Sequence, residues 1–289
     1  MNIGFFSDTF DPEINGVVTS INSAIDYFEP KNNCYVFCPK VSEKIPNTDR
    51  VWRFPSVVFP FQKEYRLAIP WNQHLKKIKA LNLDVIHIHT PFGMGLIGLK
   101  VARKLNIPVI HTYHTYFEKY LHYIPILPES WVYKYAKKES ERFCNQCQLI
   151  ISPSEEMREQ LEKFNITTRI ITLASGINKY IPTESECQNL KDRYTLKDKK
   201  TCCFVGRISQ EKNVVFLVNA FKKINQNVPE SHLMLVGDGP ETKNIKTLIK
   251  ELDLDQHITL TGYLPKEEVF TALTIADVML FPSKTETQG

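Results

Sequence analysis

An arginine and a lysine at short spacing form the pair of side chains best suited to chemistry in this sequence. Arg207 and Lys212 lie within Gly-Arg-Ile-Ser-Gln-Glu-Lys-Asn, residues 206–213. The apolar run at 202–205 predicts a buried parallel strand before them, and 214–224 predicts a helix after them. A planar guanidinium and a mobile ammonium at such a junction suit the oxygens of a diphosphate. A solvated basic loop is the alternative interpretation of so short a motif.

Two more candidate residues stand where strands are expected to end. Gly16 closes a polar loop that follows the apolar run at 2–6, and His111 lies near the end of the run at 108–112. Ligands of open parallel sheets bind beyond the carboxyl ends of the strands. Gly16 would let a backbone amide approach an anion at a helix N-terminus, or it serves a tight turn alone. For His111 the alternative is a structural hydrogen bond to the backbone.

Glycines also follow the strand expected at 232–236. Gly237 and Gly239 stand in Gly-Asp-Gly-Pro, and Pro240 suits the first position of a helix. Taken alone, these residues predict a turn between a strand and a helix, with the glycines providing its dihedral angles.

Histidine and cysteine are the candidate metal ligands, and neither is patterned for a metal. Four histidines lie in or just after two predicted strands: His87, His89, His111 and His114. No carboxylate is patterned with them, which favours core and cleft histidines. Among seven cysteines, Cys144 and Cys147 form a Cys-x-x-Cys pair without a second pair at zinc-ribbon spacing. The sequence therefore predicts reduced, mostly buried thiols and no metal site.

Alternating apolar runs and helical patterns must position these residues. Strands are expected at 2–6, 34–38, 51–54, 85–89, 108–112, 149–152 and 170–173, and then at 201–205, 232–236, 258–261 and 278–281. Helices are expected at 17–28, 73–81, 94–105, 130–144, 155–164, 214–224, 241–252 and 266–273.

This alternation predicts an α/β protein with two Rossmann-like, doubly wound parallel-sheet domains, the second incomplete. The first domain is expected at 1–175 and the second at 201–289. Residues 176–200 are polar and irregular and contain Pro182, so we expect them to form a linker. A dinucleotide oxidoreductase is excluded because no Gly-x-Gly-x-x-Gly follows the first strand.

Composition is that of a soluble globular protein, with 43% hydrophobic and 24% charged residues among 289. The net charge of +4 gives no argument for a nucleic-acid partner without a clustered basic patch. No apolar run reaches the length of a membrane span, and the N-terminus lacks the cationic leader of a signal peptide. These features predict a cytoplasmic protein.

The order of several motifs resembles that of the retaining glycosyltransferases with the B-type, two-Rossmann fold and a Glu-x7-Glu signature. The motifs are Gly-Arg-x-x-x-Glu-Lys-Asn at 206–213, Gly-Asp-Gly-Pro at 237–240, Thr-Gly-Tyr at 261–263, and Phe-Pro-Ser at 281–283 with Glu286. The resemblance spans nearly the whole chain. Residues 16–20, 112–115 and 286–289, together with Tyr120, are more narrowly similar to bacterial diacylglycerol glucosyltransferases.

The resemblance implies a role for each candidate. Arg207 and Lys212 would neutralise the diphosphate of the departing UDP, and Gly16 would lie in a loop facing the donor. His111 matches an active-site histidine that touches the sugar, and Glu286 matches the first glutamate of the signature, against the donor hexose.

Donor and acceptor also follow from the resemblance. Gly237 and Gly239 would belong to the donor-binding loops of the second domain, and the first domain would carry the acceptor. Glucose would pass from UDP-glucose, a substrate, to diacylglycerol with retention of configuration, and no intrinsic cofactor is implied. Front-face attack, in which the leaving phosphate takes the acceptor's proton, is the mechanism expected for this class.

A diacylglycerol acceptor requires contact with a membrane. Aromatic and cationic residues gather at 59–66 and at 113–138, as interfacial segments require. The alternative is a helix packed on the domain with its lysines reaching to water. We expect a peripheral protein on an anionic membrane surface, the inner face of the cell membrane.

The sequence stops at Gly289, where the resembled family continues into a helix and its second glutamate. We therefore expect a C-terminally truncated chain with a poorly stable second domain and weak or no catalysis. Two alternatives stay open: an inactive module that binds lipid or a partner, and a transferase with another acceptor, such as a lipopolysaccharide or polyprenyl intermediate.

Overall fold

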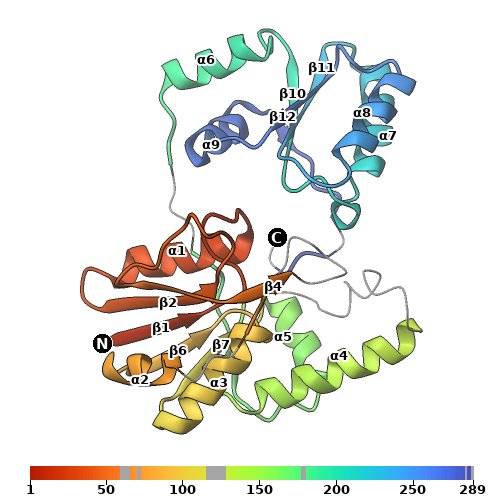
Figure 1. Cartoon of the computed structure of the whole chain (residues 1–289). Coiled ribbons are helices and arrows are strands. Elements are labelled where there is room, and N and C mark those ends of the chain that lie inside the picture. The colour runs from red at the N-terminus through yellow and green to blue at the C-terminus, as the bar shows by residue number, and fades with distance from the viewer. Residues whose placement is uncertain (59–65, 70–72, 115–127, 177–179, 284, 288–289) are drawn as a thin grey trace. The chain divides into compact units, whose positions relative to one another are not determined.

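The computed structural model describes residues 1–58, 66–69, 73–114, 128–176, 180–283 and 285–287. The chain divides into two compact units (Figure 1). Unit 1 comprises Met1–Asn178 with Glu286–Gly289, and unit 2 comprises Lys179–Thr285. The predicted segment 59–66 and the middle of 113–138 lie largely outside the described residues.

Unit 1 is built on a seven-stranded parallel sheet whose strands are short and apolar. The strands are β1 (Asn2–Phe6), β2 (Asn33–Pro39), β3 (Val51–Phe54), β6 (Val85–Ile88), β7 (Val109–Thr112), β8 (Leu149–Ser152) and β9 (Ile170–Thr172). Their order is β3-β2-β1-β6-β7-β8-β9, and each neighbouring pair is parallel. The order reverses between β1 and β6, which makes their carboxyl ends the switch point where doubly wound sheets bind ligands.

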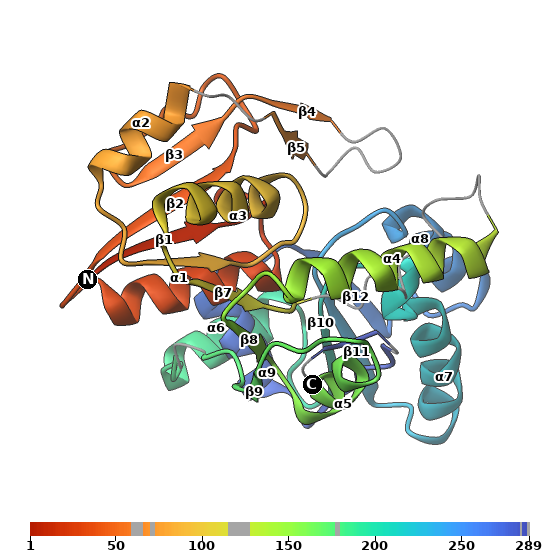
Figure 2. The same cartoon turned by 90° about the horizontal axis from the view of Figure 1, so that it is seen from below.

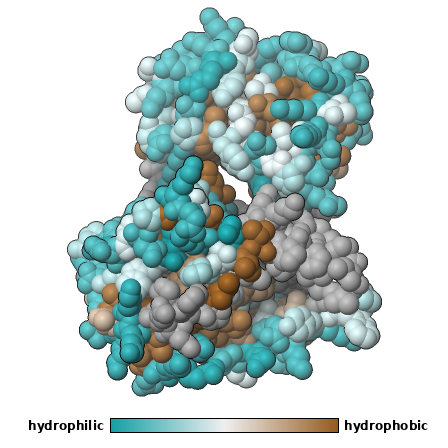
Figure 3. All heavy atoms as spheres, viewed as in Figure 1, coloured by the Kyte–Doolittle hydropathy of each residue, from teal (hydrophilic) through white to brown (hydrophobic). Residues whose placement is uncertain are grey.

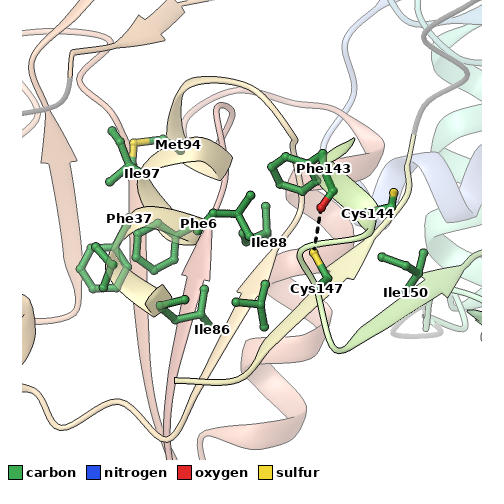
Figure 4. Packing of buried hydrophobic residues seen from close by; sticks show 14 of the residues in the cluster. Phe6, Phe37, Ile86, Ile88, Met94, Ile97, Phe143, Cys144, Cys147 and Ile150 are labelled. Carbon is green, nitrogen blue, oxygen red and sulfur yellow. Dashed lines mark hydrogen bonds between the residues drawn. The ribbon is translucent and has the colours of Figure 1, made fainter. Parts of the chain in front are cut away.

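Helices cover both faces of this sheet (Figure 1). They are α1 (Gly16–Phe28), α2 (Gln73–Ala80), α3 (Gly93–Leu105), α4 (Glu129–Cys144) and α5 (Glu155–Glu162). Phe5 points to the cluster beneath α1, and Phe6 points to the larger cluster that includes Met94 and Ile97 of α3. Figure 4 shows how this larger cluster continues to Phe143 and the neighbouring cysteines. Period-two alternation along β1 thus buries both faces of the sheet.

A short antiparallel hairpin in unit 1 was not expected from the sequence. It joins β4 (Ser56–Val58) to β5 (Arg66–Ala68), with Ser56 paired to Ala68. β5 contacts α3, and Figure 2 shows the hairpin beside that helix.

Unit 2 has a four-stranded parallel sheet. Its strands are β10 (Lys200–Val205), β11 (Ser231–Val236), β12 (Ile258–Gly262) and β13 (Val278–Met279), in the order β12-β11-β10-β13. Its helices are α6 (Glu184–Arg193), α7 (Val214–Asn227), α8 (Thr242–Glu251) and α9 (Lys266–Ile275), with the 3-10 turn η2 (Gln210–Lys212). Apolar clusters lie on both faces, centred on Phe204 and Cys203. The prediction of two parallel-sheet α/β domains is confirmed.

The segment expected to be a linker at 176–200 contains helix α6, which belongs to unit 2. Thr183 and Glu186 form a reciprocal capping box at its start, and Leu190 is buried in the unit 2 core. Arg193 Nη1 donates to Glu268 Oε2 of α9 at 2.7 Å. The Thr-x-x-Glu spacing was visible in the sequence and is the signal that the irregular polar composition concealed.

Candidate active site

The carboxyl end of β1 delivers a buried carboxylate to the start of α3. Asp8 Oδ1 accepts a hydrogen bond from the Met94 amide at 2.8 Å, and Oδ2 accepts one from Thr90 Oγ1 at 2.6 Å. Phe92, the N-cap residue of α3, makes no side-chain cap, so Asp8 supplies one from a different strand. Burial raises the pKa of Asp8 to about 6, although both hydrogen bonds oppose the rise.

Gly16 begins α1 in a position where the fold has no need of glycine. Asn15 is the N-cap, and its side-chain oxygen accepts from the Val18 amide at 3.0 Å. A Cβ added to Gly16 would meet no atom within 4 Å. The tight-turn alternative therefore has no steric support, and contact of the α1 N-terminus with an anion stays a prediction.

Four histidines gather where β6 and β7 end. His89 Nδ1 lies 2.8 Å from His114 Nε2, and His87 Nε2 lies 2.7 Å from Thr112 Oγ1. The rings of His87 and His89 have centroids 4.1 Å apart. Burial, and then the neighbouring histidines, lower the pKa of His87 and of His114 to about 3 and that of His89 well below its usual value. The cluster is therefore neutral at pH 7.

One ring nitrogen of His111 forms a hydrogen bond, and the other has no hydrogen-bond partner. Its Nδ1 lies 2.9 Å from the Ile88 carbonyl oxygen, which only accepts, so Nδ1 carries the proton. Nε2 then has a lone pair, and it is a buried atom without a hydrogen-bond partner. Burial lowers the pKa of His111 to about 4. The backbone bond is the one that the structural alternative predicts, and the contact of His111 with a sugar stays a prediction.

The end of the described chain lies against the same edge of unit 1. Ser154 Oγ donates to the Thr287 carbonyl oxygen at 2.6 Å, and Thr287 Oγ1 donates to the His114 carbonyl oxygen at 3.0 Å. Glu286, the residue before Thr287, is grouped with unit 1. These bonds bring the Glu286 backbone to the edge that also carries the histidine cluster.

In unit 2, the loop from Gly206 to Asn213 joins β10 to α7 as predicted. Lys212 closes the turn η2, and Asn213 adopts a left-handed conformation with φ of 57° before α7 begins. Lys212 Nζ lies 5.7 Å from the centroid of the Phe281 ring, within cation–π range. Ser209 Oγ is buried without a hydrogen-bond partner. Arg207 and Lys212 thus sit on one short loop at the carboxyl end of a strand.

Gly237 and Gly239 are required by the packing of this loop against the next one. A Cβ on Gly237 would lie 2.1 Å from the Gly206 carbonyl oxygen, and a Cβ on Gly239 would lie 2.3 Å from that of Ile208. Gly237 also has φ of +131°, which L side chains rarely adopt. The structure thus gives both glycines a packing role, and their contact with a donor stays a prediction.

Gly237→Ala is expected to destabilise unit 2 by about 3 kcal/mol or more, because the clash is with backbone and adds to dihedral strain. Urea unfolding followed by far-UV circular dichroism measures this, since all three tryptophans precede residue 179. The matched control is Gly16→Ala, which should cause no loss and a gain of up to about 1 kcal/mol. Equal stability of the two variants would contradict the packing role.

Asp8 and Asp238 are polar residues at strand ends that sequence reasoning did not assign. Asp238 Oδ1 accepts from the Gly239 amide at 2.7 Å and from Thr242 Oγ1 at 2.5 Å, and these bonds lower its pKa. Each aspartate stands two residues beyond the last residue of a strand and before the next helix, a position that could have identified both. Among the described residues, no cluster of three His, Cys, Asp or Glu side chains could hold a metal ion.

Two family models together match nearly the whole chain. The model of glycosyltransferase family 4 matches residues 14–179, and that of glycosyl transferases group 1 matches residues 187–289. The α-monoglucosyldiacylglycerol synthase of Acholeplasma laidlawii is 34% identical, and the alignment covers 100% of this chain and 76% of the relative. The synthase of the same name from Streptococcus pneumoniae is 33% identical, with coverage of 100% and 67%.

Solved structures show the same fold at lower identity. Anabaena HepE in complex with UDP-glucose superposes with a TM-score of 0.73 at 16% identity, covering 98% of this chain and 74% of that one. Sucrose-phosphate synthase from Thermosynechococcus elongatus gives 0.74 at 17% identity, covering 100% and 77%. The chain therefore belongs to the sugar-transferring enzymes of the two-Rossmann glycosyltransferase fold, in the family that includes the α-monoglucosyldiacylglycerol synthases.

Proposed function

We propose that this protein transfers glucose from UDP-glucose to the free hydroxyl group of a membrane diacylglycerol and retains the α configuration. The identity to two α-monoglucosyldiacylglycerol synthases, along the full length of this chain, is the observation that carries the proposal. The UDP-glucose complex of a structural neighbour supports the choice of donor.

Bond changes in this reaction balance without a cofactor. The acceptor oxygen forms a bond to the anomeric carbon while the bond from that carbon to the UDP phosphate breaks. The acceptor's proton passes to the departing phosphate oxygen. Arg207 and Lys212 would stabilise the charge that develops on the diphosphate. His111 Nε2, with its unpartnered lone pair, would accept a hydrogen bond from a hexose hydroxyl group.

The remaining candidates contribute contacts to the donor in this proposal. Glu286 would accept hydrogen bonds from the hexose, and the N-terminus of α1 at Gly16 would face the donor's anionic part. Gly237 and Gly239 would shape the donor loops through their close backbone packing.

An anionic membrane surface at the inner face of the cell membrane is part of the proposal. Helix α4 exposes Trp131 by 71% and Tyr135 by 66%, and exposed Lys134 and Lys138 accompany them. Exposure on this scale favours an interfacial helix over one packed on the domain. No helix among the described residues combines the length and the hydropathy that crossing a bilayer requires.

A transfer assay tests the donor and the acceptor separately. The chain is incubated with radiolabelled UDP-glucose or GDP-mannose and with vesicles that contain diacylglycerol or a polyprenyl phosphate. GDP-mannose is included because a GDP-mannose-dependent α-mannosyltransferase of Corynebacterium glutamicum is 26% identical over 99% of this chain. The expected product is an α-glucosyl lipid from UDP-glucose and diacylglycerol alone.

A chain extended past Gly289 with the C-terminal segment of the Acholeplasma relative runs beside it. Product from the extended chain alone would indicate that residues beyond 289 complete the site. If the extended chain transfers only from GDP-mannose or only to polyprenyl phosphate, the proposed donor or acceptor is wrong. Binding to vesicles without transfer by either chain would support the inactive lipid-binding module.

A further inference from the structure

A serine at the start of helix α5 donates a hydrogen bond to a residue far along the chain. Ser154 is the N-cap of α5, and its Oγ accepts from the Met157 amide at 3.2 Å. The same hydroxyl group donates to the Thr287 carbonyl oxygen at 2.6 Å, across 133 residues of sequence. Capping uses only a lone pair of the oxygen, so the donated bond gives this hydroxyl group a second role.

Ser154 is itself held in place. Its backbone has the extended conformation of an N-cap, with φ of −147° and ψ of 162°. Its carbonyl oxygen accepts a hydrogen bond from Ser152 Oγ at 2.8 Å, and Ser152 is buried at the end of β8. Pro153, between the two serines, has a φ angle fixed by its ring. The Ser154 hydroxyl group is therefore a donor with a defined position.

Thr287 is attached to unit 1 at a second point. Its Oγ1 donates to the carbonyl oxygen of His114 at 3.0 Å, just beyond the end of β7. β7 and β8 are neighbouring parallel strands, with Thr112 paired to Ile151. One bond to the backbone of Thr287 and one from its side chain fix both the place and the orientation of this residue. Because Glu286 is covalently joined to Thr287, the same bonds fix where the Glu286 backbone lies.

The attached segment is polar. Thr285, Glu286 and Thr287 are each half-buried. Exposed apolar side chains of unit 1 gather elsewhere, for example at Val57 and Val58 of β4, where Figure 3 shows a hydrophobic strip. Since none of the three side chains of the segment is a large apolar group, the loss of one hydrogen bond should loosen it measurably.

We propose that Ser154 holds the Glu286–Thr287 segment on unit 1 and is thereby a positioning residue for glucosyl transfer. The inference rests on the proposed function, in which Glu286 accepts hydrogen bonds from the donor hexose. A functional group that is misplaced by about 1 Å loses much of its effect on the rate, so the residue that fixes its backbone matters. Capping of α5 alone is the other role that Ser154 could have.

An aspartate at this position separates the two roles. Ser154→Asp keeps the cap, because aspartate is about as good an N-cap as serine. It removes the bond to Thr287, because a carboxylate has no proton to donate and repels a carbonyl oxygen. Ser154→Thr retains both the acceptor and the donor, and it is the conservative variant that should restore the wild-type behaviour.

Proteolysis of the native full chain with a glutamyl endopeptidase measures how firmly the segment is held, independently of transfer. Cleavage after Glu286 requires the segment to leave unit 1, so the rate follows the population of the open state. Ser154→Asp is expected to raise this rate about tenfold, from the loss of one hydrogen bond, and Ser154→Thr should match the wild type. Ser154 and Thr287 are 133 residues apart, so the sequence that the protease recognises is unchanged.

Ser42→Asp is the matched control. Ser42 Oγ accepts from the Lys44 amide at 3.2 Å in a loop of unit 1, and it donates no hydrogen bond to any described residue. The same change from hydroxyl to carboxylate should therefore leave the cleavage rate after Glu286 at the wild-type value. Equal cleavage rates for Ser154→Asp and the wild type, with circular dichroism unchanged, would overturn the proposal.

Transfer assays with the chain extended past Gly289 separate this inference from the proposed function. Ser154→Asp should lower kcat/KM for UDP-glucose about tenfold and leave the KM for diacylglycerol unchanged, because Glu286 is expected to contact the donor. Faster cleavage of Ser154→Asp without any transfer by the wild type would support the attachment by Ser154 and refute the proposed reaction. Faster cleavage with the wild-type kcat/KM would support the reaction and refute the positioning role.

Discussion

Arg207→Ala and Lys212→Ala are each expected to lower kcat/KM for glucosyl transfer by about 100- to 1,000-fold. The reaction places negative charge on a departing diphosphate, and a fixed cation that meets this charge in the transition state contributes about 3 to 4 kcal/mol. Both side chains stand on the eight-residue loop 206–213, between β10 and α7. Gly237 and Gly239 pack closely against the backbone of this loop, at the carbonyl oxygens of Gly206 and Ile208.

Conservative variants separate geometry from charge. Arg207→Lys keeps the charge but loses the planar fork, so it should recover only a small part of the activity. The double variant should lose less than the product of the two single losses if both cations act on one diphosphate. Because Arg207 and Lys212 carry other contacts in the free protein, circular dichroism of each variant is needed to confirm that the fold persists.

Lys223→Ala is the control, because Lys223 is an exposed cation on α7 of the same unit. It should leave kcat/KM unchanged. The same variants made in the chain extended past Gly289 keep the test decisive whatever the activity of the 289-residue chain. Calorimetric titration with UDP gives a second measurement, in which both alanine variants should bind more weakly. Retention of more than half the wild-type activity by folded Arg207→Ala would sink the phosphate-binding role.

The two sheets were predictable because their strands are buried on both faces. Cys202–Val205 of β10 and Leu233–Val236 of β11, for example, are continuous apolar runs in the sequence, and all of their residues except Val205 are buried. The β4–β5 hairpin was missed because three-residue antiparallel strands with exposed valines have no distinct period. Helix α6 was missed because only Leu190 among its residues is fully buried, so its pattern is weak.

The place of the candidate residues in the fold could be predicted from the sequence, but the atoms that surround each of them could not. Strand ends located Arg207, His111 and Gly237, because a parallel sheet collects its carboxyl ends on one edge. The sequence could not distinguish Gly16, where a Cβ meets nothing, from Gly237, where it strikes a carbonyl oxygen. That difference depends on a loop thirty residues away in the chain, between Gly206 and Ile208, which local patterns do not encode.

Unit 1 is expected to lose most of its stability between pH 6.5 and pH 4.5, because its buried histidines resist protonation. The folded-state pKa is about 3 for His87 and His114 and about 4 for His111, and that of His89 is also far below the usual value. In the unfolded chain each would titrate near about 6.5. Below that pH the unfolded chain binds up to four protons that the folded unit does not bind, so the free energy of unfolding falls as pH falls.

Asp8 changes the pH dependence of the stability of unit 1 in the opposite direction between pH 6.5 and pH 4.5. Its folded-state pKa of about 6 exceeds its unfolded value of 3.8, so the folded unit holds one proton that the unfolded chain releases. The net difference is about three protons, which corresponds to about 4 kcal/mol for each pH unit when all sites are counted in full. Over two pH units the loss is about 8 kcal/mol, which is comparable with the roughly 5 to 15 kcal/mol that stabilises a typical domain.

Tryptophan fluorescence isolates this effect, since the three tryptophans at 52, 71 and 131 all belong to unit 1. The urea midpoint should fall steeply as pH is lowered from neutrality. His111→Gln removes one histidine that resists protonation in the folded unit. The slope of the unfolding free energy against pH should therefore decrease by the equivalent of about one proton. Asp8→Asn removes the opposing site and should make it steeper by about the same amount, because asparagine keeps an oxygen for the Met94 amide. Shifts of the same sign in the two variants would refute the assignment, since the two groups pull stability in opposite directions as pH falls.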